Sequence, residues 1–174
     1  IGNILRNLQV AGYALTSPHL YGEIGKCPAL ALHGASMRRL LEQMGTARRT
    51  RYWIVRQVER GRLDPSRTLF YTYWFDGTAL GVSLARRRHP EIKHVTRAHG
   101  FDLYEERHDP PHMPFREEVL DTIYRVFLVS EHGKEYLSRK YPAFESKYTV
   151  SRLGVDDPRF STEPSSDGVF RMVS

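Results

Sequence analysis

Short apolar segments alternate with helix-like segments over the second half of the chain, and this alternation constrains the fold more than any other feature. Strand-like runs occur at 68–74 (TLFYTYW), 92–98 (IKHVTRA), 125–130 (RVFLVS) and 147–154 (KYTVSRLG). Helix-like segments lie between them at about 77–88, 115–124 and 131–141. Strands that alternate with helices indicate successive βα units and hence a parallel sheet. The sequence therefore predicts an α/β fold with a doubly wound parallel sheet, in which the nearly all-apolar run at 68–74 is covered on both faces.

Positive charge is concentrated in one predicted helix. The chain has a net charge of +6, and the segment 35–62 alone carries eight arginines against two glutamates. Its apolar residues recur at three- and four-residue steps, as on the buried face of an amphipathic helix. We expect this basic helix to end near Gly61 and Pro65. Its arginines form a solvated face, a docking surface for anionic lipid or a nucleic-acid surface. Nucleic acid is the least favoured, because few aromatic residues lie between the arginines.

The composition excludes several classes of protein. A chain with 40% hydrophobic and 26% charged residues is typical of a globular domain, and it has no apolar run of about 18 residues to span a bilayer. Its first residues lack the features of a signal peptide. The single cysteine, Cys27, cannot form an internal disulfide, so reducing, cytosolic conditions are the default expectation.

The composition changes after Gly154. The segment VDDPRFSTEPSSDG is polar with two prolines, which is typical of a linker, whereas the terminal VFRMVS resembles the opening of a buried strand. We therefore expect one domain over 1–156, a linker over 157–168 and the first strand of a truncated second domain at 169–174. The chain also lacks an initial methionine, so we expect that it was cut from a longer protein.

Candidate site residues follow the predicted strands, because ligands of α/β sheets bind beyond the carboxyl ends of the strands. They are Tyr73 and Trp74 after the first strand, Arg97, His99, Gly100 and Asp102 at the second, Ser130 at the third and Arg152 at the fourth. Each also has a structural interpretation. His99 could be satisfied by backbone carbonyls, Asp102 could cap a turn and Ser130 could cap the next helix. Tyr73 and Trp74 could be core or rim aromatics, and Arg152 could only mark a hinge.

The eight histidines raise the question of a metal site. His108 and His112 have the i, i+4 spacing of a metal-binding pair on a helix. Prolines lie within and just after this interval, so no helix would align the two rings. No metal site is therefore expected there.

Six stretches, taken in order, carry a family resemblance. They are FYTYWFDGTAL, HVTRAHGFDLYEE, MPFREEVLD, FLVSEHGKEYLSRKYP, YTVSRLGV and FRMVS. Together they resemble the N-terminal half of a retaining glycosyltransferase of the GT-B architecture, in the group-1 family (family 4) that builds bacterial capsule, lipopolysaccharide and exopolysaccharide. The resemblance covers about 66–174. It implies two Rossmann-like domains that face each other across a cleft, of which this chain is the acceptor-side one, incomplete at its N-terminus. Such an isolated fragment is expected to be inactive.

The resemblance also implies roles for the strand-end residues. His99 would be the catalytic residue that reaches the donor sugar, where oriented dipoles stabilise an oxocarbenium-like charge. Arg97 would hold an acceptor phosphate or carboxylate, and Gly100 would let the backbone approach the substrate. Asp102 and Tyr104 would lie on the acceptor side. Tyr73 and Trp74 would form a sugar platform, while Ser130 and Arg152 would be further binding residues.

The partners implied by the resemblance are a nucleotide-sugar donor and a glycan or lipid-linked acceptor, with no metal or other cofactor. The expected location is cytoplasmic, with the option of peripheral contact with the inner face of the membrane through 35–62. Two other classes remain open. An α/β hydrolase or phosphatase-like domain is disfavoured because the chain has neither a G-x-S-x-G elbow nor a P-loop. The other is a basic domain that binds lipid or nucleic acid.

Overall fold

The structure is a computed structural model in which residues 12, 16–154, 167 and 169 are described. Its helices are α2 (Pro18–Lys26), α3 (Ala29–Leu32), α4 (Gly34–Glu59), α5 (Gly77–Arg86), α6 (Arg116–Thr122) and α7 (Glu131–Lys140), with 3-10 helices η1 (Glu105–Arg107) and η2 (Pro142–Lys147). Its strands are β1 (Leu69–Thr72), β2 (Lys93–Ala98), β3 (Arg125–Leu128) and β4 (Tyr148–Val150). The predicted strands and helices are thus present. The predicted linker and second-domain strand lie outside the described residues, apart from 167 and 169, and stay predictions.

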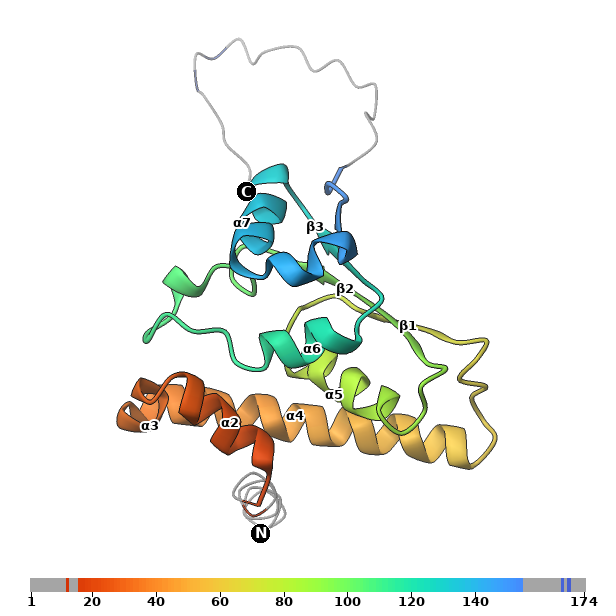
Figure 1. Cartoon of the computed structure of the whole chain (residues 1–174). Helices are drawn as coiled ribbons and strands as arrows, with labels where there is room; N and C mark the ends of the chain where they lie inside the picture. The colour runs from red at the N-terminus through yellow and green to blue at the C-terminus, as the bar shows by residue number, and fades with distance from the viewer. Residues whose placement is uncertain (1–11, 13–15, 155–166, 168, 170–174) are drawn as a thin grey trace.

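The four strands form one parallel sheet in the order β1-β2-β3-β4 (Figure 1). Each connection steps to the next strand in the same direction, and right-handed connections of this kind place their helices on one face. The core agrees, because one buried cluster joins Leu84 of α5, Leu120 of α6 and Leu137 of α7 to Ala98 and Leu128 of the sheet. The predicted α/β class with a parallel, Rossmann-like sheet is therefore confirmed.

The two faces of the sheet differ in burial. The face toward the helices is buried at Thr72, Thr96 and Val126. On the opposite face, Leu69 is 58% exposed and Tyr71 is 52% exposed. The expectation that 68–74 is covered on both faces is therefore wrong. The described helices pack on one side of β1 only, and an apolar run cannot show by itself which of its sides is covered.

The basic helix predicted at 35–62 is α4, which spans 26 residues. It is followed by Gly61 at φ 65°, a left-handed conformation that glycine adopts without strain. α5 crosses α4 very closely. A Cβ on Gly77 would lie 2.5 Å from the backbone oxygen of Gln43, and a Cβ on Gly81 would lie 2.5 Å from Thr50 Cβ. The two glycines, about one turn apart on α5, therefore allow the close contact that fixes α4 against α5.

A buried polar group connects β1 and β2 within the core. The Thr72 hydroxyl donates to Thr96 Oγ1 at 2.7 Å, and Thr72 Oγ1 is 3.1 Å from His94 Nε2. Since the Thr72 hydrogen is directed at Thr96, its oxygen accepts the Nε2–H of a neutral imidazole. His94 is fully buried, and burial, aided by the charge of Arg86, lowers the pKa of His94 to about 3. The fold therefore holds this histidine uncharged at neutral pH.

Candidate functional site

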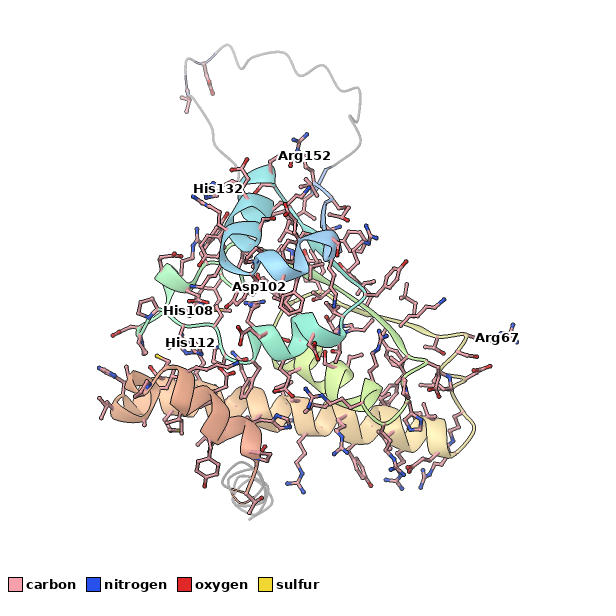
Figure 2. All side chains as sticks on the ribbon, viewed as in Figure 1. Arg67, Asp102, His108, His112, His132 and Arg152 are labelled. Atoms are coloured by element: carbon pink, nitrogen blue, oxygen red, sulfur yellow. The ribbon has the colours of Figure 1, made fainter. Side chains whose placement is uncertain are left out.

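The carboxyl ends of the four strands meet along one edge of the sheet, as the parallel topology requires. The predicted residues that follow β1, β2, β3 and β4 therefore lie along this edge. Figure 2 shows His132 and Arg152 near the start of α7, with Asp102 further toward the middle of the molecule. The contacts of each residue decide what it can do at this edge.

The imidazole of His99 lies against two aromatic rings from the loop after β1. Its centroid is 4.7 Å from that of Tyr73 and 4.6 Å from that of Trp74. The His99 side chain is 13% exposed, whereas Tyr73 and Trp74 are 49% and 46% exposed. Neither ring nitrogen of His99 has a hydrogen-bond partner among the described residues. The two nitrogens are closed to solvent as well as unpaired, so a ligand hydroxyl can bond to them, as donor or as acceptor, only when the Tyr73 or Trp74 ring moves aside.

Asp102 ties together the two loops that hold these three rings. Its Oδ1 accepts the backbone N–H of His99 at 2.5 Å, and its Oδ2 accepts the backbone N–H of Phe75 at 2.7 Å. Asp102 is 5% exposed, so these bonds are largely shielded from solvent. His99 Nδ1 is 3.8 Å from Asp102 Oδ2, which is too far for a hydrogen bond. Asp102 therefore caps the turn after β2, as the structural interpretation predicts, and also links that turn to the loop after β1.

Arg116 completes this support, and the sequence did not identify it. Its guanidinium lies 3.7 Å from the centroid of the Phe75 ring and donates to the carbonyls of Phe75 at 3.3 Å and Asp102 at 2.5 Å. Arg116 is 4% exposed, and burial lowers the pKa of its guanidinium. One signal pointed to it. An arginine in the first turn of a helix opposes the helix dipole, so its position at the start of α6 requires another reason.

Three other predicted residues have protein partners. Arg97 donates to Ser151 at the end of β4, to the backbone oxygen at 3.0 Å and to Oγ at 3.2 Å. Ser130 Oγ accepts the backbone N–H of Gly133 at 3.1 Å, so its predicted role as the N-cap of α7 is confirmed. Arg152 is exposed and lies 3.9 Å from Glu131. Arg152 alone of these three has a side chain directed mainly at solvent.

A second aromatic group joins the loop after β2 to α7. The Tyr104 ring is 5.6 Å from that of His132 and 4.9 Å from that of Tyr136.

The space above Gly100 is taken by Arg107, since a Cβ there would lie 3.1 Å from Arg107 Nη1. In this arrangement Gly100 gives room to a protein side chain, and the predicted approach of a substrate to its backbone requires Arg107 to move.

The two histidines at the i, i+4 spacing have separate partners. His108 Nε2 is 2.8 Å from the Phe101 carbonyl, and His112 Nε2 is 2.8 Å from Glu23 Oε2. Among residues 16–154 and the isolated described positions, no group of three or more His, Cys, Asp or Glu could hold a metal ion.

Comparisons with protein-family models, with curated proteins and with solved structures found no match to this chain. None of the described helices combines the length and the apolar character needed to cross a membrane. The functional conclusion therefore depends on the geometry at the carboxyl edge of the sheet.

Proposed function

We propose that this chain is the acceptor-side Rossmann-like domain of a retaining, metal-independent glycosyltransferase. The enzyme would move a hexose from a nucleotide-sugar donor to a glycan or lipid-linked acceptor in surface polysaccharide synthesis. The observation that supports this most is the His99 imidazole, which is shielded at the strand ends between two half-exposed aromatic rings and has both nitrogens unpaired. A buried imidazole nitrogen without a partner costs free energy, which a hydrogen bond to a ligand hydroxyl would offset.

In this proposal a ring nitrogen of His99 hydrogen-bonds a hydroxyl of the donor hexose. Tyr73 and Trp74 offer flat apolar surfaces to the carbon face of the sugar ring. Positive charge develops at the anomeric carbon as the bond to the diphosphate breaks, and groups fixed before the reaction stabilise it best. Asp102 and Arg116 are positioning residues, because they hold the loops that carry His99 and the aromatic pair.

Trp74 gives a direct readout of sugar binding, because Trp53 is the only other tryptophan. In a Trp53→Phe background we expect saturable changes in Trp74 emission with uridine or guanosine diphosphate hexoses or with an acceptor glycan. The His99→Ala variant should lose this response, while His33→Ala, at an exposed histidine next to α4, should keep it. A response that is unchanged in His99→Ala would show that the sugar does not use this imidazole.

Turnover is tested by nucleotide release, with the same donors, in a polypeptide that joins this chain to a donor-side domain. That domain is needed because the proposal assigns most donor contacts to it. Loss of one preorganised hydrogen-bonding group lowers the rate by about 100-fold in comparable sites, and we expect this for His99→Ala. Near-unchanged release would rule out the catalytic role of His99.

The hydrolase alternative receives less support from the same edge of the sheet. Ser130 is the serine that follows β3, and its oxygen accepts the N–H of Gly133 as a helix cap. The described His residues include none within hydrogen-bond distance of its Oγ. Ser130 therefore lacks the adjacent base that a nucleophilic serine requires.

A further proposal concerns the outward face of α4, which we expect to dock on anionic membrane, where a lipid-linked acceptor would lie. Tyr52 and Trp53 are 63% and 55% exposed there, and Arg49, Arg56 and Arg60 are exposed at helical spacing around them. Exposed aromatics beside arginines are typical of helices that lie at a membrane surface.

Vesicle sedimentation tests this docking. We expect binding to vesicles of phosphatidylcholine with phosphatidylglycerol, weaker binding at high salt, and loss of binding in Arg49→Glu/Arg56→Glu. The control variant is Arg67→Glu/Lys93→Glu, which makes the same change in net charge away from this face of α4. It should bind the anionic vesicles as the wild type does. Equal binding to neutral vesicles would refute electrostatic docking.

A further inference from the structure

The open face of the sheet carries a groove of about 620 Å³ near the amino ends of β1, β2 and β3. Its apolar lining includes Leu69, Val95 and Phe127, and its charged lining consists of Arg67, Lys93 and Arg125. We call it the amino-end groove. Figure 2 shows Arg67 at the right of the view and Arg152 at the top. The groove lies at the amino ends of the strands, whereas the candidate site lies at their carboxyl ends.

The strand register explains how apolar and charged residues alternate across this groove. Leu69 pairs with Lys93, and Val95 pairs with Arg125 on the next strand. Paired residues of parallel strands point to the same face, as do residues two apart on one strand. Leu69 therefore lies beside Lys93, and Val95 beside Arg125, on the same open face of the sheet.

The cations of the groove take part in no ion pair with the described residues. No Asp or Glu lines the groove. Among the ion pairs formed by the described part of the chain, none includes Arg67, Lys93 or Arg125. Arg125 donates only to a neutral group, Thr149 Oγ1, at 2.8 Å. The groove thus presents three cations that form no ion pair, although local hydrogen bonds and the nearby charge of Arg67 lower the pKa of the Asp64 carboxyl.

Parallel sheets are normally covered on both faces, because their crossover connections place helices there. A ligand that fills this groove needs apolar side chains that pack on the apolar lining and carboxylates that pair with the three cations. An amphipathic helix with acidic flanks meets both needs. The sequences of residues 1–15 and 155–174 do not have this pattern. Residues 1–15 contain no Asp or Glu, and residues 155–174 contain prolines at 158 and 164.

We propose that the amino-end groove docks an amphipathic helix of a partner polypeptide. The apolar stripe of that helix covers Leu69, Val95 and Phe127, and its Asp or Glu side chains pair with Arg67, Lys93 and Arg125. This inference is independent of the glycosyltransferase proposal, since the two surfaces share no residue.

The test uses the 15N-labelled chain and two synthetic amphipathic peptides of about 18 residues, or about five helical turns. Both carry the same leucine stripe, and one has Glu and the other Lys on its flanks. We expect the Glu peptide to cause saturable amide shifts in residues 67–71, 93–97 and 125–127, and the Lys peptide to cause none there. Arg67→Glu/Lys93→Glu should weaken binding of the Glu peptide by about tenfold or more. Both altered residues are exposed, so the fold is expected to remain.

The control variant is Arg49→Glu/Arg56→Glu, which makes the same change in net charge on α4 and should bind the Glu peptide as the wild type does. Three outcomes would overturn the proposal. The Glu peptide could shift only signals of α4, it could fail to bind at about millimolar concentration, or it could bind Arg67→Glu/Lys93→Glu unchanged. A thymidine oligonucleotide is included as a further ligand. If it shifts the groove signals and the Glu peptide does not, the groove is a nucleic-acid surface and the helix proposal is wrong.

Discussion

Lowering the pH from about 7 to about 5 is expected to destabilise this chain through one residue, His94. The imidazole is fully buried beside Thr72 and has a pKa of about 3 in the fold, because burial and the nearby Arg86 disfavour its charged form. The ordinary pKa of histidine is about 6.5, which we take for the unfolded chain. Between these two values the unfolded chain binds a proton that the folded chain does not. Stability therefore falls as the pH falls through this window.

The size of the effect follows from the two pKa values. The difference is equivalent to about 5 kcal/mol if the pH is lowered through the whole window. By about pH 5 the loss is about 2 kcal/mol, which is a large part of the stability of a typical domain. Urea unfolding, followed by far-UV circular dichroism at several pH values, measures this loss. His94→Gln keeps a donor to Thr72 but does not titrate, so its stability should fall about 2 kcal/mol less than that of the wild type.

The matched control is His33→Gln, which removes an exposed histidine next to α4. Its stability should follow the pH dependence of the wild type. If the wild type and His94→Gln instead give parallel curves between about pH 7 and about pH 5, His94 does not resist protonation in the fold. The account of the buried polar group between β1 and β2 would then be wrong.

Two further substitutions test how the loops and helices are held together. Asp102→Asn replaces one oxygen by an NH2 group, so one of the two backbone N–H groups loses its acceptor; we expect a loss of about 1–3 kcal/mol in urea unfolding. The control is Asp76→Asn, because the Asp76 side chain accepts a single backbone N–H at the start of α5, and its stability should change by less than about 0.5 kcal/mol. Equal losses in Asp102→Asn and Asp76→Asn would contradict the role of Asp102 in linking two loops. Gly81→Ala should lower the melting temperature, with a loss of about 1–3 kcal/mol, because its Cβ would lie 2.5 Å from Thr50 Cβ. The control is Gly22→Ala, whose Cβ meets nothing within 4 Å and which should stabilise α2 by about 0.5–1 kcal/mol. If Gly81→Ala is also stabilised, α5 does not depend on the close contact between Gly81 and Thr50.

Much of the secondary structure could be predicted from sequence because its causes are local. The β-branched and aromatic runs gave the four strands, and the three- and four-residue apolar steps gave α4. Ser130 was identified as a helix cap because it directly precedes the helix that it caps, and its bond to Gly133 spans three residues. Alternation of strands and helices then indicated a parallel sheet. Neighbouring parallel strands need a long crossover connection, which is usually an α-helix.

The candidate site could be predicted only in part. The rule that ligands bind at strand ends placed His99, Tyr73 and Trp74 at the same edge. It did not show that the imidazole lies against both aromatic rings, because that contact joins the ends of different strands. Arg116 was missed for the same reason. Its partners, Phe75 and Asp102, are 41 and 14 residues away in the sequence.

The sequence by itself thus determined the class of fold, the order of its elements and the edge at which the candidate residues lie, because each depends on neighbouring residues or on a general rule of connectivity. Only the tertiary structure decided which side of β1 is covered, which oxygens of Asp102 are engaged and which cations line the amino-end groove. Burial and pairing depend on segments that meet from distant parts of the chain. Long-range contacts of this kind cannot be read from a local sequence pattern, because the same apolar run or the same carboxylate occurs in many different structural environments.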